Sequence, residues 1–192
     1  MAKIGLLYPK YCPITITQGA DGKDVETYGI VKTFAKAIRA STSLNISQSE
    51  LYADDELAET ANEFINGQLT FECDDIEDDV EADVTGAKVD EDGDIVHATT
   101  DVAPYLRFGF LIRRYKSKKS QYRGIIFTKT VFDAIPDDYE TKGETIVFKS
   151  TTMTAKFLGN ANGQWKRKSK WFDTLDEADT WMNTKLKPST TA

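Results

Sequence analysis

The sequence has few of the residues that build most small catalytic or metal-binding sites. Among its 192 residues there are one histidine and two cysteines, Cys12 and Cys73, which stand far apart and form no C-x-x-C pair. Zinc and thioredoxin-like chemistry therefore lack their usual ligands. A serine or cysteine hydrolase would depend on His97, and neither a G-x-S-x-G motif nor a phosphate-binding glycine motif accompanies it.

Long apolar runs and an excess of basic charge are missing too. No stretch approaches the roughly 20 apolar residues of a membrane helix, and the apolar run near the start is too short for a signal peptide. We therefore expect a protein made and used in the cytosol. The 24 basic residues are outnumbered by 31 acidic ones, a net charge of −7. This balance argues against tight binding of duplex nucleic acid, whose affinity comes mostly from phosphate neutralisation.

One short stretch, Tyr52-Ala53-Asp54-Asp55, matches the Y-x-D-D signature of reverse transcriptases. Adjacent carboxylates can share two hard cations. Such a site also needs a third acidic ligand and a rigid scaffold. The stretch lies within residues 41–66, which we interpret as an irregular loop, and loops of this length are usually functional or disordered. A metal-dependent polymerase is therefore a weak alternative.

A calcium loop is a second metal alternative. Asp90, Asp92 and Asp94 have the first three spacings of an EF-hand. Ile95 and Asp101, however, occupy positions where the loop requires glycine and glutamate. We interpret residues 87–98 as two short strands joined by a turn at Glu91-Asp92-Gly93.

Periodicity predicts a mainly β fold. Residues 30–40 alternate as a strand, and residues 67–73 place Leu69, Phe71 and Cys73 on one side, opposite a polar side. The apolar runs at 104–116, 121–132 and 143–157 exceed the usual strand length of about five or six residues. They indicate a broad bent sheet or strands that switch between two packed sheets, as in a sandwich or barrel.

Two segments have helical periodicity. Residues 75–85 place apolar side chains four apart and end before Gly86. Residues 173–186, after a strand at 164–172, begin with a capping residue and an acidic first turn. We therefore expect a β domain over residues 1–158, which contains the long loop and the first helix, and a strand-helix extension over residues 159–192.

Charge is unevenly distributed along the chain. Residues 72–94 contain twelve acidic side chains and one lysine, whereas residues 107–123 contain seven basic side chains and no acidic one. Each segment can simply be a solvated face. Alternatively, an acidic patch on one copy meets a basic patch on the next, a heterologous contact that generates rings or filaments. The candidate basic contact patch is Arg113, Arg114, Lys116, Lys118, Lys119 and Arg123.

Seven blocks in order resemble the major tail proteins, the tail tube subunits of bacteriophages with long non-contractile tails that infect Gram-positive bacteria. The blocks are YGIVKTFAKAIRAS, ELYADDELAE, GQLTFECDDIEDDV, PYLRFGFLIRR, YRGIIFTKTVF, TKGETIVFKSTTMTAKF and WKRKSKWFDTLDEADTWM. The likeness spans nearly the whole chain. It implies two packed β-sheets flanked by a helix, with a long loop that reaches other subunits.

The resemblance also implies a function. Such subunits assemble into hexameric rings that stack into a tube, and the genome passes through its channel without specific binding. The expected partners are further copies, the tape measure protein, the tail terminator and distal tail or baseplate proteins. The resemblance implies localisation in the virion tail after assembly in the host cytoplasm, and no enzymatic activity, cofactor, metal or membrane. A β-sandwich module that binds an unknown ligand is the alternative.

Two groups of residues are candidate sites under this resemblance. The loop at 41–66 becomes the inter-subunit element, with Leu51 and Tyr52 as apolar anchors and Asp54, Asp55 and Glu56 as charged partners. Hydroxyl-rich and polar strand faces are candidates for the channel wall, although each can equally be an outer solvated face. The candidate wall residues are Gln68, Thr70, Glu72, Ser150, Thr152 and Thr154.

Overall fold

The structure, a computed structural model, describes residues 3–188 apart from 20–21, 23, 54–55, 137–140 and 142–148. The chain is mainly β, as the sequence predicts. The elements are β1 (Lys3–Gln18), β2 (Asp24–Tyr28), β3 (Lys32–Thr33), β4 (Ala37–Ala53), β5 (Glu56–Cys73), α1 (Asp78–Thr85), β6 (Lys88–Val89), β7 (Ile95–Val96), β8 (Tyr105–Lys116), β9 (Lys119–Phe132), β10 (Thr151–Leu158), β11 (Lys166–Lys168) and α2 (Leu175–Leu186).

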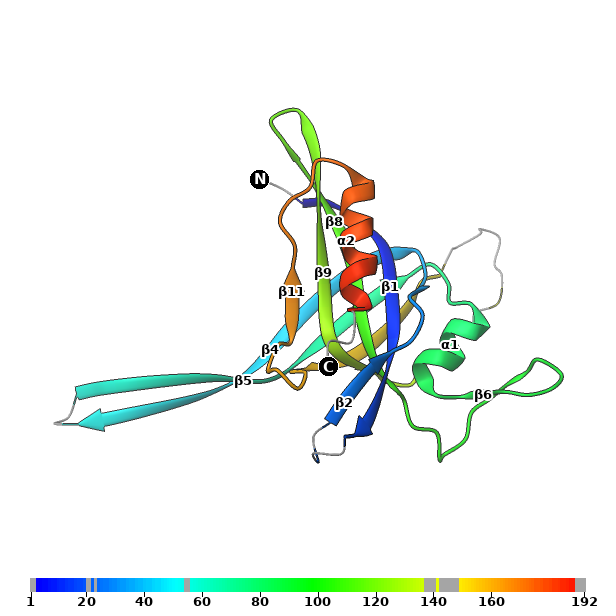
Figure 1. Cartoon of the computed structure of the whole chain (residues 1–192), viewed down its shortest axis with the longest axis horizontal. Coiled ribbons are helices and arrows are strands. Elements are labelled where there is room, and N and C mark those ends of the chain that lie inside the picture. Colours follow the sequence, from blue (N-terminus) through cyan, green and yellow to red (C-terminus); the bar gives the residue numbers. More distant parts are fainter. Residues whose placement is uncertain are drawn as a thin grey trace.

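Nine of the strands form one antiparallel sheet (Figure 1). Its path runs β2-β1-β8-β9-β10-β5-β4, with β3 beside β1 and β11 beside β9. The long strand β9 pairs with β10 along residues 129–132 and with β11 along residues 125–127. One strand thus has two neighbours along the same edge, and the two expected layers are halves of a single bent sheet.

The two halves pack around an aromatic core. Phe71 of β5, Phe108 of β8 and Phe132 of β9 are each at most 1% exposed and belong to one cluster. The predicted alternation of β5 is confirmed, because Leu69, Phe71 and Cys73 are all fully buried. Burial raises the pKa of the Cys73 thiol to about 12, since the thiolate would lose its hydration.

Helix α2 covers the outer face of the half formed by β1, β8 and β9. Ala178, Met182 and Leu186 are fully buried and pack with Leu111 of β8 and Ile126 of β9. These three helix positions are four residues apart, so they form one stripe along the helix. The predicted C-terminal helix therefore packs on the sheet of its own chain.

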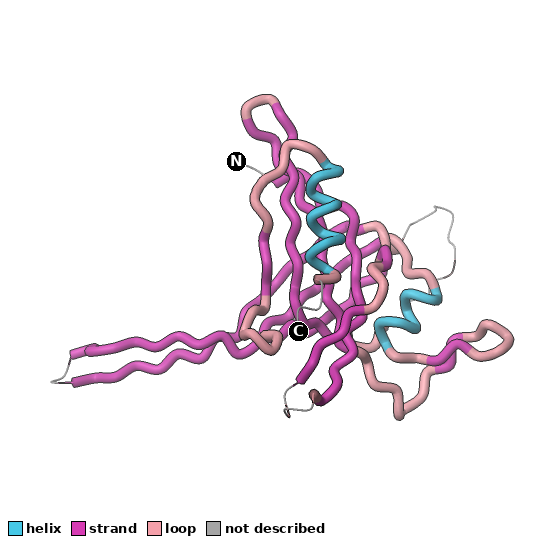
Figure 2. The backbone as a smooth tube through the Cα atoms, viewed as in Figure 1, coloured by secondary structure: helices cyan, strands magenta, loops and turns pink. Residues whose placement is uncertain are grey.

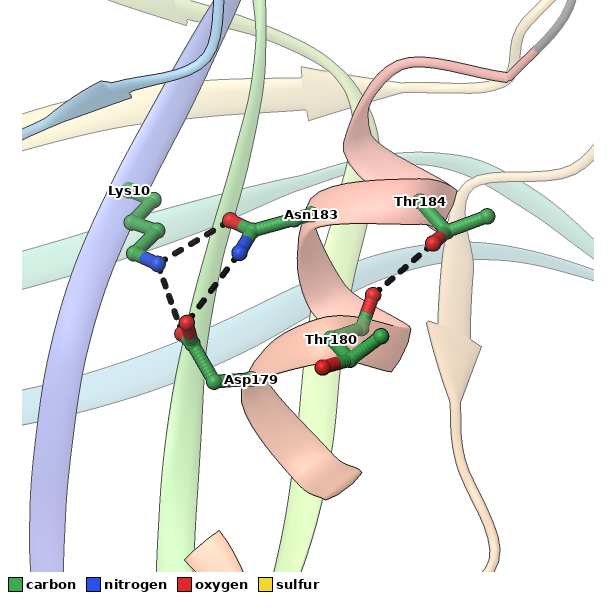
Figure 3. A network of polar contacts seen from close by, with 5 residues as sticks. All are labelled: Lys10, Asp179, Thr180, Asn183 and Thr184. Carbon is green, nitrogen blue, oxygen red and sulfur yellow. Dashed lines mark hydrogen bonds and ion pairs between the residues drawn. The ribbon is translucent and has the colours of Figure 1, made fainter. Parts of the chain in front are cut away.

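Polar contacts fix α2 against β1 (Figure 3). The ammonium of Lys10 lies 2.6 Å from a carboxylate oxygen of Asp179 and 3.0 Å from the side-chain oxygen of Asn183. At the start of α2, the Thr174 hydroxyl accepts a hydrogen bond from the backbone N–H of Glu177, so Thr174 is the N-cap.

Helix α1 lies at one end of the core and begins three residues later than predicted. Its Val80 and Val84 join the aromatic cluster, and Asp83 accepts a hydrogen bond from the Tyr11 hydroxyl at 2.6 Å. The helix ends at Gly86, whose φ of 79° is left-handed. A Cβ at Gly86 would lie 2.4 Å from the carbonyl oxygen of Val102, so this position excludes other residues.

The loop predicted at residues 41–66 is wrong, because residues 41–53 and 56–66 belong to the paired strands β4 and β5. The pairing continues from Ala37 opposite Cys73 to Ala53 opposite Glu56. Strand β10 accompanies β5 only as far as Gly67. Beyond it the two strands project from the body as an arm, residues 45–53 and 56–66 (Figures 1 and 2). Side chains at 45–50 and 61–63 are exposed, so the arm lacks the apolar alternation by which a strand is recognised.

The continuous strand predicted at residues 30–40 is also wrong. Within this segment, only Lys32 and Thr33 pair with β1. The chain then leaves the sheet before β4 begins at Ala37. Phe34 turns into the core and is 2% exposed, whereas Ile38 is 53% exposed, although a continuous strand would put both side chains on the same face. Burial of one aromatic ring thus interrupts the two-residue period.

An aromatic stack anchors the base of the arm. Phe64 lies 4.6 Å from Trp165 between ring centroids, and Trp165 lies 5.6 Å from Phe157. The Phe157 ring also covers Gly67, where a Cβ would lie only 2.1 Å from it. Gly67 therefore gives the ring the space it needs at the point where the arm leaves the body.

The tip of the β8–β9 hairpin contains a strained turn. Ser117 and Lys118 have φ of 52° and 62° and lie between the paired residues Lys116 and Lys119. Two left-handed residues define a type I′ turn, for which Asn-Gly is the preferred sequence. A residue with a side chain in this region costs about 1 kcal/mol.

We predict that Gly67→Ala lowers the free energy of unfolding by about 1–3 kcal/mol, because the added methyl group displaces the Phe157 ring. Urea denaturation followed by tryptophan fluorescence measures the change. Gly5→Ala is the matched control, since its Cβ would meet Arg113 at an ordinary 3.8 Å. Equal stability of the two variants would contradict the packing at the arm base.

We also predict that Lys118→Gly raises the free energy of unfolding by about 0.5–1 kcal/mol, because glycine relieves the left-handed strain. Lys116→Gly should lower it by a similar amount, since Lys116 is an ordinary strand residue. Thermal denaturation followed by circular dichroism compares the two. A loss of stability in Lys118→Gly would refute the strained turn.

Candidate assembly surfaces

Both polar sets proposed for a channel wall lie on one face of the sheet. Strand β10 pairs with β5 so that Thr152 is opposite Glu72 and Thr154 is opposite Thr70. The Ser150 hydroxyl donates a hydrogen bond of 2.7 Å to a carboxylate oxygen of Glu72. Directly opposed residues of antiparallel strands point to the same side. The structure therefore joins two groups that are about 80 residues apart in sequence.

Strand β4 extends this surface with residues that the sequence reasoning missed. Ser41 is opposite Thr70, and Ser43 is opposite Gln68. Their alternating hydroxyls were a usable signal, but it lay in the segment interpreted as a loop. We define the polar face as Arg39, Ser41, Ser43, Gln68, Thr70, Glu72, Ser150, Thr152, Thr154 and Lys156.

Hydroxyls and opposed charges make the polar face nearly neutral. Arg39 is opposite Glu72, and the Thr154 hydroxyl donates to Asp133 at 2.7 Å. Lys156 adds a cation opposite Gln68. A surface of this kind offers hydrogen bonds but little net attraction for phosphate. It can contact a duplex without holding it.

The arm holds the predicted inter-subunit residues. Leu51 and Tyr52 belong to β4 and Glu56 to β5, while Asp54 and Asp55 lie outside the described residues, as do the side chains of the other three. The structure thus places the backbone of Leu51, Tyr52 and Glu56 near the end of the arm.

The outer edge of β4 is one of the two ends of the sheet. In the described part of the chain this edge has no neighbouring strand. Arg39 and Glu50 are the only charged residues between 37 and 53, and this stretch has no proline. Natural edge strands usually carry lysine or proline that prevents pairing with other chains. The β4 edge is therefore suited to accept a strand.

The predicted basic patch divides into two groups. Arg113 binds the Ser120 hydroxyl at 3.1 Å, while Arg114 and Arg123 lie 3.8 and 4.8 Å from the ring centroid of Trp171. These arginines are held by their own chain. Among the described residues, the second group forms no ion pair and gathers at the hairpin tip; it consists of Lys116, Lys118 and Lys119.

The acidic segment at 72–94 spans the end of β5, helix α1 and the β6–β7 hairpin. Asp83 pairs with Lys32, and Glu81 lies 3.2 Å from His97. In the β6–β7 turn, the Asp90 carboxylate accepts the backbone N–H groups of Asp92 and Asp94 at 3.0 and 2.9 Å. Asp90 thereby stabilises its own turn, and calcium coordination is not needed to explain it.

The described residues were also compared with the requirements of a metal-ion site and of a membrane-spanning helix. Within the ranges that the structure describes, no group of three histidine, cysteine, aspartate or glutamate side chains is placed to hold a metal ion. In the same ranges, neither helix has the length and apolar character needed to cross a membrane.

Comparison of the chain with protein-family models gives no match, and neither does comparison with curated proteins. The comparisons therefore assign the chain to no family. Its function has to be inferred from the polar face, the arm and the edge of β4.

Proposed function

We propose that this protein is a tail tube subunit of a bacteriophage with a long non-contractile tail. It self-assembles into stacked hexameric rings that form the conduit for genome delivery. The observation that carries the proposal is the β4–β5 arm, a long exposed ribbon that leaves the body of its own chain. The ordered blocks of sequence that resemble tail tube subunits supply the kind of assembly.

The arm needs a partner for physical reasons. Nine residues of β4 beyond Leu44 extend it by about 30 Å. An isolated two-stranded hairpin is at best marginally stable in water. Its base bears three half-exposed apolar side chains, Leu44, Ile46 and Ile65, which are 47%, 45% and 51% exposed. Contact with a neighbouring subunit buries such side chains and satisfies the edges of the ribbon.

The polar face and the β4 edge suit a channel. If the edge of β4 pairs with a neighbouring subunit, the polar faces of successive subunits join into a closed barrel. A nearly neutral hydroxyl-rich wall lets DNA slide. In this proposal the remaining partners are the tape measure protein, the tail terminator and distal tail or baseplate proteins. The protein is assembled in the host cytoplasm and works in the virion, as a structural component and not as an enzyme.

Negative-stain electron microscopy and light scattering of the concentrated protein test the proposal, with rings or tubes as the expected result. We predict that Leu51→Ala combined with Tyr52→Ala weakens tube formation at least tenfold, because apolar anchors at the centre of an interface contribute about 2 kcal/mol or more. Circular dichroism should report an unchanged monomer fold.

Ser47→Ala combined with Ser49→Ala is the matched control on the same strand and should assemble normally. Unchanged tube formation in the Leu51 and Tyr52 variant would contradict the role of these two residues as anchors. A wild-type protein that remains monomeric at the highest concentration it reaches would contradict the tube itself.

Labelling of an introduced cysteine tests which side of the tube the polar face occupies. We predict that Thr152→Cys reacts with a bulky maleimide-polyethylene glycol in the monomer and at least tenfold more slowly in tubes, because the channel excludes the reagent. The background should be low, since Cys12 and Cys73 are fully buried and burial raises the pKa of both thiols.

Thr184→Cys is the matched control, because Thr184 is exposed on α2, which covers the other half of the sheet. Its labelling should change little on assembly. Equal labelling of Thr152→Cys in monomers and tubes would place the polar face on the outside.

A further inference from the structure

The β8–β9 hairpin ends in a compact cationic tip. Lys116, Lys118 and Lys119 lie within four residues, and none of them pairs with a described acidic side chain. Tyr115 beside them is 52% exposed. The tip projects from the body at the top of Figure 1. It therefore presents three cations and an aromatic ring to solvent.

Lys118 occupies a position that disfavours it. Its φ of 62° and that of Ser117, 52°, belong to the left-handed region, which asparagine or glycine adopts more easily. A lysine there lowers stability while it places a charge at the apex of the hairpin. Strained backbone positions often occur at functional sites, and here the strained position places a positive charge at the apex of the hairpin.

The β6–β7 hairpin has the opposite charge. Among the described residues its two short strands pair only with each other, outside the main sheet, and a two-stranded sheet is marginal in water. Val89 and Val96 are about half exposed, at 51% and 49%. The carboxylates of Glu91, Asp92 and Asp94 make no ion pair with a described residue, and they also lie within four residues.

The two hairpins cannot meet within one chain, because they project from different sides of the body (Figure 1). We propose that the β8–β9 tip of one copy docks on the β6–β7 hairpin of the next copy. The contact is heterologous, since each copy contributes one surface and receives the other, and it therefore repeats from subunit to subunit. It rests on the proposed function and specifies a second contact of that assembly, separate from the arm.

Exposed valines beside the acidic residues favour the β6–β7 hairpin over the arm as the partner of the tip, since Val89 and Val96 are 51% and 49% exposed. Residues 41–66 also contain six acidic side chains and no basic one, three of them consecutive at Asp54, Asp55 and Glu56, so acidic charge alone does not choose between the two partners. Glu91, Asp92 and Asp94 match the three lysines in number and spacing. Complementary charges set register and partner choice, and Tyr115 can cover an exposed valine.

Charge exchange tests the contact. The tip variant is Lys116→Glu, Lys118→Glu and Lys119→Glu, and the acidic-hairpin variant is Glu91→Lys, Asp92→Lys and Asp94→Lys. Each alone should associate at least tenfold more weakly than wild type in sedimentation velocity. An equimolar mixture should assemble again with a 1:1 composition, because each reversed surface then meets its complement in the other variant.

Two further variants separate the contact from net charge and from folding. Lys168→Glu, Lys170→Glu and Lys187→Glu changes the net charge as the tip variant does, at exposed residues away from the tip, and should assemble like wild type. Lys118→Gly should associate about two- to fivefold more weakly, because it removes one partly solvated charge pair, although it unfolds at a higher temperature.

The outcomes distinguish the contact from the function. If wild type forms tubes and the tip variant does so equally, or if the mixture fails to assemble, the contact is overturned and the tube proposal stands. Carbodiimide cross-links from the tip lysines to residues 50–63 instead of 91–94 would identify the arm as the partner and also overturn it. If wild type forms neither rings nor tubes, the proposed function fails and the contact fails with it.

Discussion

The burial of Phe34 between the two halves of the sheet is the interaction on which the rest of the architecture depends. Its ring meets Tyr11 of β1 at 5.8 Å, Phe71 of β5 at 5.5 Å, Phe108 of β8 at 5.2 Å and Phe132 of β9 at 5.3 Å. Aromatic pairs of this kind contribute about 0.5–1.5 kcal/mol each beyond burial alone. One ring from a short connection thus ties four strands together and fixes where β4 begins.

This packing commits β5 and β10 to one orientation. Their aromatic and aliphatic side chains face Phe34, so their hydroxyl and amide side chains must face outward. Helix α2 covers the corresponding outer face of the other half, through the fully buried Ala178, Met182 and Leu186. In the described part of the chain, the sheet therefore has an outer face covered by α2, a bare polar face and an open edge at β4. The bare face, the open edge of β4 and the projecting arm are the three features on which the proposed assembly rests.

Much of the fold could be predicted from the sequence, because local periodicity reflects which side of an element is buried. The alternation of Leu69, Phe71 and Cys73, the helix that ends at Gly86 and the capped C-terminal helix all agree with the structure. Local periodicity is lost where burial does not alternate. Residues 41–50 and 61–63 have exposed side chains on both sides of the ribbon, and Phe34 leaves its strand to fill the core.

The sequence by itself determined the strand and helix segments and the separation of acidic from basic residues, because these depend on neighbours along the chain. Only the tertiary structure decided that Thr152 lies opposite Glu72, that Arg114 and Arg123 of the basic patch stack on Trp171, and that Lys118 lies at a left-handed position at the hairpin apex. These facts depend on strand register and on contacts between distant residues. A one-residue shift in the pairing of a strand would move all of its side chains to the opposite face of the sheet, and the pairing register cannot be read from a single sequence.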